Sequence, residues 1–169
     1  MDVIPTGMHR RDVALVKDTE DIIFSGGSYL HTQRYEHNLS LWNSLKDKEQ
    51  EDTYGRTKLD NIEYASEDKP LTAHTKRTNL KDEQGNSIEI LRQSMPYGDM
   101  KCQGLFFVSY CHSPRPFTLM LESMIYGDGH GHVDHLLKYT QAETGAAFFA
   151  PSLTFLLELA PSTDNNDAL

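Results

Sequence analysis

The sequence predicts an α+β fold of the ferredoxin-like type, in which helices cover one face of an antiparallel sheet. Two observations lead to this class. Strand-like and helix-like segments follow the order β-α-β-β-α-β, which is typical of that sandwich. The chain has 169 residues, 38% of them hydrophobic, which is enough for one packed core. We take residues 1–160 as one domain and residues 161–169 as a polar, acidic and disordered tail.

The first third of the chain supplies strands and short helices. Residues 12–16 form a short apolar run that we interpret as a strand. After a Ser-Gly-Gly turn signal at 25–27, residues 28–35 are rich in Tyr and Thr and alternate loosely, which favours another strand. Asn38 can cap a short apolar helix. The charged residues 46–52 indicate a solvated helical turn.

The middle of the chain combines a long loop with further strands. Residues 60–75 mix charge with few apolar side chains and predict a loop, and loops of this length are usually functional or disordered. Residues 82–86 read Asp-Glu-Gln-Gly-Asn, a turn signal that predicts a hairpin between 75–80 and 87–91. The strongly apolar run 104–110 predicts a strand buried on both faces.

The last third predicts a long helix followed by three shorter elements. Ser113 and Pro114 mark the helix start, with Ser as the cap and Pro as the first helical residue. Apolar side chains at helical spacing carry this helix to Tyr126, and Gly127 ends it. The remaining elements are a helix at 133–139, a strand at 146–149 and a helix at 152–159. We expect the helices at 113–126 and 152–159 to cover the sheet.

Charge and hydropathy exclude several classes of protein. The formal net charge of −9 argues against a nucleic-acid binder, which needs basic residues to displace counterions from phosphates. No run of 18 apolar residues is present, so no membrane span is expected. The first eleven residues contain no apolar segment of a secretory signal. Cys102 and Cys111 would lie about 30 Å apart in an extended segment, too far for a disulfide, and we therefore predict reduced thiols and a cytoplasmic location.

Three histidines near residue 130 are candidates for a metal site. His130, His132 and His135 accompany two carboxylates within nine residues, and imidazole with carboxylate suits a borderline metal. The competing interpretation is a glycine-rich loop with exposed histidines. No second pair of ligands at a known metal spacing occurs elsewhere, so we favour the loop.

His74 and Arg92 are the more informative polar residues. His74 lies in the long loop, outside any run of charge, and Arg92 follows 18 residues later among apolar neighbours. A buried Arg needs a partner, because burying an unpaired charge is expensive. From this pattern alone, an ordinary salt bridge for Arg92 and a surface position for His74 are the simplest explanation.

Seven segments, taken together, resemble the DyP-type (dye-decolourising) haem peroxidase family, in its cytoplasmic bacterial class. They are GGSY at 26–29, QRYEHNL at 33–39, GRTK at 55–58, His74, RQSMPYG at 92–98, GLFFVSY at 104–110 and TGAAFFAPS at 144–152. The resemblance covers only the C-terminal half of such a protein, whose members have two ferredoxin-like halves forming a dimeric α+β barrel. It implies haem b as the cofactor, with this half holding most of the haem.

The resemblance assigns roles to five residues. His74 matches the proximal ligand of the haem iron, and Asp134 falls where the family places its acidic partner. Arg92 matches the distal arginine. Arg56 matches a position that contacts a haem propionate, and Ser94 stands where some relatives carry Asn.

Two further assignments follow from the same resemblance. The apolar run 105–108, which includes Phe107, would line the porphyrin pocket together with Phe148 and Phe149. Asp2 falls near the place of the family's distal aspartate, but the stretch MDVIPTG departs from the family's pattern there. We expect a residue so near a chain end to be held less rigidly than Arg92.

The residues leave two functions open. The first is a haem-dependent peroxidase that oxidises phenolic or dye-like donors with hydrogen peroxide. The second is a truncated, non-catalytic haem-binding module. Half of a two-part architecture exposes apolar surface, so we also expect a homo-oligomer.

Overall fold

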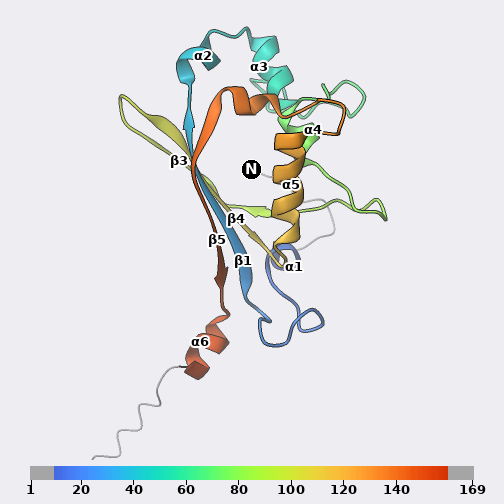
Figure 1. Cartoon of the computed structure of the whole chain (residues 1–169), viewed down its shortest axis with the longest axis vertical. Coiled ribbons are helices and arrows are strands. Elements are labelled where there is room, and N and C mark those ends of the chain that lie inside the picture. The colour runs from blue at the N-terminus through green and yellow to red at the C-terminus, as the bar shows by residue number, and fades with distance from the viewer. Residues whose placement is uncertain (1–9, 160–169) are drawn as a thin grey trace, which may run out of the picture.

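A five-stranded antiparallel sheet forms the centre of the fold, in the computed structural model, which describes residues 10–159 (Figure 1). Its strands are β1 (Ser28–His37), β2 (Leu91–Arg92), β3 (Met95–Gly98), β4 (Gln103–Cys111) and β5 (Thr140–Ala150). The strand order is β2-β4-β1-β5, and β3 also pairs with β4. The long strands β1, β4 and β5 therefore carry most of the sheet, with β5 at an edge.

Helices precede, interrupt and follow these strands. They are α1 (Arg10–Ala14), α2 (Leu39–Asn43), α3 (Asp47–Tyr54), α4 (His74–Thr78), α5 (Arg115–Tyr126), the 3-10 helix η1 (His135–Lys138) and α6 (Leu153–Leu159). The structure confirms the α+β class, an antiparallel sheet with helices. None of the helices within residues 10–159 has the length and apolar character needed to cross a membrane.

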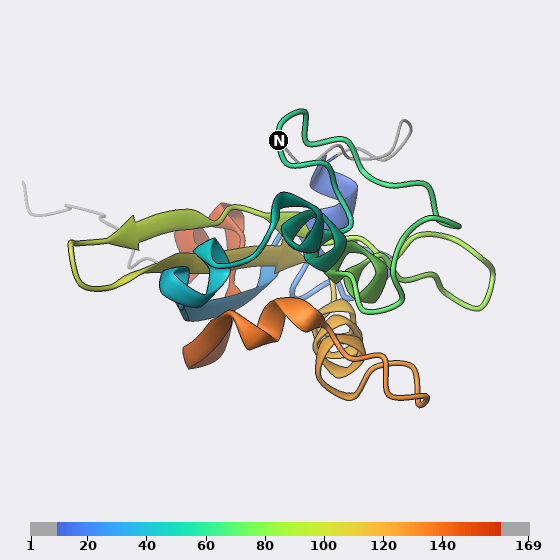
Figure 2. The same ribbon diagram turned by 90° about the horizontal axis from the view of Figure 1, so that it is seen from above.

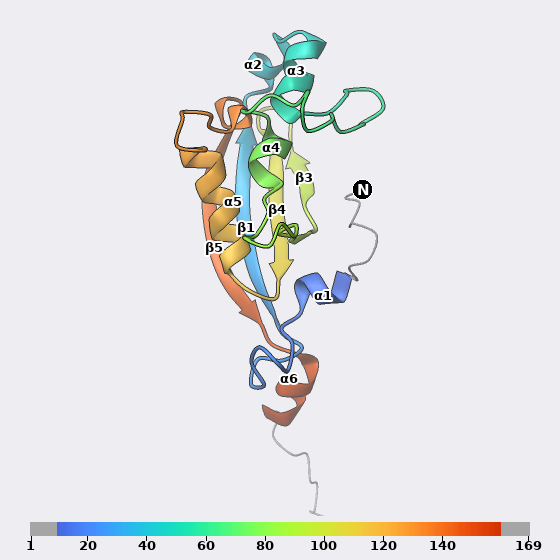
Figure 3. The same cartoon turned by 90° about the vertical axis from the view of Figure 1, so that its right-hand side faces the viewer.

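One face of the sheet carries the helix layer. Figure 1 shows α5 and α4 to the right of the sheet, and Figure 3 shows them in front of it. Figure 2 shows that η1, in orange, lies on the same side as α5. Phe117 and Met120 of α5 pack with Ile90 and Cys111 in the buried core. The core therefore lies between this face and α5, because the apolar stripe of the helix faces the sheet there.

The opposite face of the sheet is bare of described helices. Phe106 of β4 and Phe148 of β5 are 38% and 55% exposed, although both are large apolar side chains. Every residue from 141 to 148 of β5 is exposed. We call the surface formed by Phe106, Phe148 and Met95 the bare face.

Two glycines permit close packing near the sheet. Gly55 ends α3 in the left-handed conformation, with φ of 79°, which suits a residue without Cβ. Gly104 lies where β4 passes β1, and a Cβ there would collide with the carbonyl oxygen of Tyr35 and the ring of Tyr97. A side chain at either position would strain the backbone or displace its neighbours.

Several predicted elements are confirmed with shifted ends. Asn38 caps α2 by accepting a hydrogen bond from the backbone N–H of Leu41 at 3.0 Å. The long helix ends at Gly127 as predicted, but it begins at Arg115, with Pro114 as its cap residue. The strand expected at 146–149 is longer, Thr140–Ala150, and β1 continues to His37.

Four predictions about the fold are wrong. Residues 10–14 are the helix α1, which buries Val13 and Ala14, because so short an apolar run does not distinguish strand from helix. Residues 75–80 contribute to α4, so the expected hairpin shrinks to an isolated bridge between Lys81 and Ser87.

The other two errors concern what covers the sheet. The strand at 104–110 is not buried on both faces, because its Phe106 belongs to the bare face. The last helix, α6, extends beyond the end of β5 and does not cover the sheet (Figure 1). The tail at 161–169 lies outside the described residues.

Candidate active site

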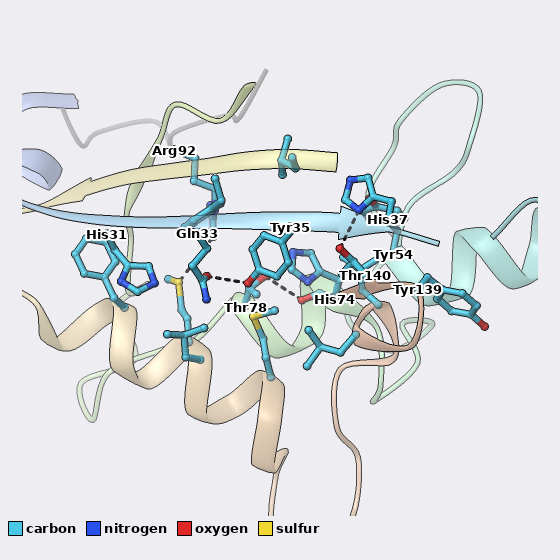
Figure 4. A pocket seen from close by; sticks show the side chains of 18 of the residues that line it. His31, Gln33, Tyr35, His37, Tyr54, His74, Thr78, Arg92, Tyr139 and Thr140 are labelled. Carbon is cyan, nitrogen blue, oxygen red and sulfur yellow. Dashed lines mark hydrogen bonds between the residues drawn. The ribbon is translucent and has the colours of Figure 1, made fainter. Parts of the chain in front are cut away.

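A cavity of about 410 Å³ lies between the sheet and the helix layer (Figure 4). The sheet side is formed by alternate residues of β1 (His31, Gln33, Tyr35 and His37), by Arg92 of β2, and by Leu105 and Phe107 of β4. The helix side is formed by residues of α4, α5 and η1, among them His74, Thr78, Phe117, Met120, Leu121, Met124, Leu136 and Leu137. A mostly apolar cavity with a few polar groups, within about 300–1,000 Å³, is typical of a ligand site.

His74 enters this cavity from the first position of α4. Its Nδ1 donates a hydrogen bond to Oδ2 of Asp134 at 2.7 Å, over a separation of 60 residues. The imidazole side chain is 27% exposed. In a neutral imidazole whose Nδ1 is the donor, Nε2 carries the lone pair, which is the state that a metal ligand needs.

Asp134 is the most deeply buried acidic residue among residues 10–159, at 1% exposure. Its second oxygen, Oδ1, accepts a hydrogen bond from the backbone N–H of Leu136 at 2.9 Å and so caps η1. Its own N–H donates to the carbonyl oxygen of Met124 at 2.9 Å, which ties it to α5. A buried carboxylate held on both oxygens fixes the orientation of the His74 ring.

Arg92 reaches the cavity from the sheet side. Its described polar contact is a weak one, from Nη2 to Sδ of Met120 at 3.8 Å, and it forms no ion pair with any residue of 10–159. The guanidinium is therefore available to a negative charge inside the cavity. The salt bridge that the sequence pattern favoured for Arg92 is absent among the described residues.

A polar row runs along β1 on the cavity wall. The hydroxyl of Tyr35 donates to Oε1 of Gln33 at 2.8 Å. Burial, with a smaller contribution from the negative charge of Asp134, raises the pKa of Tyr35 to about 12. Tyr35 therefore stays protonated and remains a hydrogen-bond donor across the physiological pH range.

Aromatic rings close one end of the cavity around His74. Tyr54 of α3 meets the His74 ring edge to face, with 6.1 Å between centroids. Trp42 of α2 contacts Tyr54 at 5.6 Å and Tyr139 at 5.2 Å, again edge to face. Such contacts fix ring orientations and add to the burial of apolar surface.

The structure brings together four of the residues assigned from the sequence. His74, Arg92 and Phe107 line the cavity, and Asp134 lies directly behind His74. Phe148 does not, because it belongs to the bare face. Phe149 packs against Phe24 and Tyr29 at the end of the sheet and is outside the cavity lining.

Two other assigned residues are not gathered at the cavity. The Arg56 guanidinium is held locally, with Nε donating to Oδ1 of Asn61 and Nη1 to Glu63, both at 2.9 Å. Ser94 lies between β2 and β3, outside the lining. Asp2 falls outside the described residues.

The histidines near residue 130 do not form a metal cluster in the described part of the chain. His132 pairs with Asp128 instead, with Nδ1 2.7 Å from Oδ2. The hydrogen bond from His132 and two backbone N–H groups hold the pKa of Asp128 well below its ordinary range. His130 is exposed, as the loop interpretation expects.

Sequence reasoning missed most of the cavity wall. The expected strand at β1 was a usable signal, because side chains of a strand point alternately to its two faces. Residues 31, 33, 35 and 37, all polar, therefore share one face. Trp42, Tyr54 and Tyr139 carried no such signal. They come from separate short elements that meet only in the folded chain.

Comparison with known proteins identifies the family. The family model described as "Dyp-type peroxidase, C-terminal" matches residues 5–155. The chain belongs to the DyP-type peroxidase family. The match covers most of the chain, so the membership applies to the whole described fold.

Individual DyP-type relatives agree with this. The dye-decolorizing peroxidase of Mycolicibacterium paratuberculosis is 40% identical over 144 residues, covering 84% of this chain and 41% of the relative. A crystal structure described as a dyp-type peroxidase protein from Shewanella oneidensis is 62% identical, with a TM-score of 0.88, covering 92% of this chain and 50% of that one. A DypB variant from Rhodococcus jostii RHA1 in complex with heme is 37% identical, with a TM-score of 0.81, over 85% and 47% of the two chains. The chain therefore spans only about two-fifths to one-half of these DyP-type relatives.

Proposed function

We propose that this protein binds haem b in the cavity and acts as a peroxidase, oxidising small phenolic or dye-like donors with hydrogen peroxide. The observation that carries this proposal is the His74–Asp134 pair on the helix side of the cavity, with Arg92 on the sheet side, where it forms no ion pair with any residue of 10–159. Family membership supports it, as does the haem held by the similar DypB variant. The similar chains are about twice as long as this one.

The residues of the cavity fit a haem group. Its walls are mainly apolar, which suits the faces of a porphyrin, and a neutral imidazole with a free Nε2 is a common ligand of haem iron. His74 would hold the haem iron, because its imidazole is the side chain of the cavity whose ring nitrogen is oriented by a buried carboxylate. When bound, haem supplies the redox-active iron that reacts with peroxide and takes electrons from the donor.

Two residues of the chain have separate roles at this site, one toward the iron ligand and one toward developing negative charge. Asp134 accepts the Nδ1 proton of His74, which keeps the imidazole in one tautomer and raises its basicity as a ligand. Arg92 is charged at every accessible pH, so it stabilises negative charge without titrating. Preorganised positive charge in a water-poor cavity is a large contributor to rate.

Three other residues have roles proposed from the family resemblance. Asp2 is proposed as a distal proton-transfer group. Arg56 would reach a propionate only by giving up its bonds to Asn61 and Glu63. Ser94 would need its connecting segment to turn toward the cavity.

We further propose a cytoplasmic homo-oligomer. Cys102 and Cys111 are both free thiols in the structure, which suits a reducing compartment. The bare face, with Phe106 and Phe148, is an apolar surface that a second copy would cover.

The alternative function is a haem-binding module without catalysis. Both functions are proposed for a chain that spans 41% to 50% of each relative. The two functions share His74 and differ only at the peroxide step. An experiment on Arg92 therefore separates them.

The test measures peroxide reactivity of the haem-loaded protein. Arg92→Leu should lower the rate of the peroxide-dependent absorbance change about 10²–10³-fold while haem stays bound, because one preorganised charge is lost. Arg34→Leu, on β1 outside the cavity lining and stacked over the Tyr97 ring, is the matched control and should react like the wild type. A wild-type protein that binds haem but does not react with peroxide would establish the non-catalytic alternative. Equal rates for Arg92→Leu and wild type would refute the role given to Arg92.

A further inference from the structure

His31 lies in the same row across the sheet as Arg92. In the strand register Arg92 is opposite Ser109, and Ser109 is opposite His31. Side chains of directly opposite residues point to the same face of a sheet. With neighbouring strands about 4.8 Å apart, the Cα atoms of Arg92 and His31 are separated by about 10 Å. Ser109, between them in the row, is small and fully buried, and both His31 and Arg92 line the cavity (Figure 4).

The ring of His31 is held firmly by its neighbours. It stacks on Phe117 with 5.5 Å between centroids and an interplanar angle of 25°. It also meets Phe107 edge to face at 6.5 Å. Both contacts fix the ring plane before anything enters the cavity.

One nitrogen of this ring has no partner within residues 10–159. The Nε2 atom is shielded from solvent and makes no hydrogen bond to any residue within 10–159. A buried polar atom without a bond costs folding free energy, and an apolar ring at this position would pack without that cost. The unpaired nitrogen therefore indicates a bonding partner that arrives with the contents of the cavity.

His31 is neutral near pH 7. Burial lowers its pKa below the ordinary value of 6.5, and a hydrogen bond with Gln33 offsets part of this effect. Among the side chains that face His31 within residues 10–159, Arg92 is the charged one. The other groups facing it do not titrate: Phe107 and Ser109 of β4, Phe117 and Met120 of α5, and Ala147 of β5.

We propose that His31 is the base that takes the proton of hydrogen peroxide in this cavity, beside Arg92. The step is a proton transfer without oxidation. One O–H bond of the peroxide breaks, its proton forms a new N–H bond at Nε2, and the electron pair stays on oxygen as the hydroperoxide anion. The imidazole becomes an imidazolium, and Arg92 stabilises the anion. This inference rests on the proposed peroxidase function and adds a base that does not depend on Asp2.

The first test uses the haem-loaded protein and two probes that must both lose a proton, hydrogen peroxide and hydrogen cyanide. His31→Gln keeps a polar side chain that cannot accept a proton at neutral pH, and His31→Asn is a second variant in case the first does not fold. Both should lower the association rate of each probe about 10²-fold or more, with unchanged haem stoichiometry. His112→Gln, at a surface histidine paired with Glu20, is the control for removing an imidazole.

The pH dependence gives a second expectation. In the wild type the cyanide association rate should fall on acidification, with a midpoint below pH 6.5, because protonated His31 no longer accepts a proton. This acid limb should disappear in His31→Gln. Rates within threefold of wild type at pH 7, or an unchanged acid limb, would overturn the assignment.

A measurement without haem completes the test. Ring nitrogen NMR of the haem-free protein should show Nε2 of His31 unprotonated at pH 7, and a protonated Nε2 there would contradict the proposal. A wild-type protein that binds no haem would contradict the peroxidase function and this inference with it. A wild type that reacts with peroxide while both His31 variants keep its rates would contradict the role of His31 alone.

Discussion

The two faces of the sheet differ in what their side chains meet. On the helix-covered face, Phe117 is 7% exposed. The Asp134 carboxylate is also buried there, and each of its oxygens accepts a hydrogen bond. On the bare face, Phe106 and Phe148 are exposed, although they belong to strands β4 and β5 of the same sheet. The covered face holds the cavity and its polar groups. The bare face is exposed apolar surface.

This difference shows which parts of the fold are completed by the described residues of this chain. The helix layer, the core and the His74–Asp134 pair all come from within one chain, so the candidate site is assembled by its own elements. Phe106, Phe148 and Met95 of the bare face are left exposed by these elements. The similar structures are about twice as long, and the chain matches about half of each.

A matched pair of substitutions tests this contrast most strongly. Phe117→Ala should lower the free energy of unfolding by about 3–5 kcal/mol, because it empties a buried position of the core. Phe148→Ala should lower it by less than about 1 kcal/mol, because the ring is already 55% exposed. Urea unfolding followed by circular dichroism measures both.

The Phe148 variant also reports on self-association. If a second copy covers the bare face, sedimentation should show weaker association for Phe148→Ala than for Phe117→Ala or wild type. Equal losses of stability for the two variants would show that Phe148 is packed in the folded monomer and would remove the contrast between the faces.

A smaller effect is expected from the carboxylate behind His74. Asp134→Asn keeps the size of the side chain, but its amide N–H₂ would face the Nδ1–H of His74 if the oxygen kept its bond to Leu136. Loss of such a partner typically lowers metal affinity about 10–100-fold. Haem titration followed at the Soret band measures this.

The control for Asp134→Asn lies on a strand end outside the cavity. Glu36→Gln removes one exposed carboxylate of β1 without touching the lining. It should leave haem affinity unchanged. Equal haem affinity for Asp134→Asn and wild type would mean that the hydrogen bond to His74 does not tune the ligand.

The sequence allowed much of the fold to be predicted where local signals were strong. Asn38, Gly55 and Gly127 mark helix ends through capping chemistry that depends on nearby residues alone. The same reasoning failed for residues 12–16 and 75–80, where runs of about five residues fit either helix or strand. Neither run has an alternation long enough to decide.

The candidate site was predictable only through the family resemblance. His74 and Asp134 are 60 residues apart, and no local pattern connects them. Arg92 was recognised as a charge needing a partner, yet the predicted salt bridge does not form among the described residues. His31 drew no attention, because its importance depends on the strand register that places it in the row of Arg92.

The central claim is that the cavity on the helix-covered face binds haem through His74. The most direct measurement is a haem titration of the wild type and of His74→Ala, followed by the Soret band, with His130→Ala as a control at an exposed histidine. The wild type and His130→Ala should each bind one haem. His74→Ala should lose stoichiometric binding or shift the Soret band strongly, because the imidazole is the proposed iron ligand. An unchanged spectrum for His74→Ala, with haem lost on replacing His130, His132 or His135, would contradict the claim.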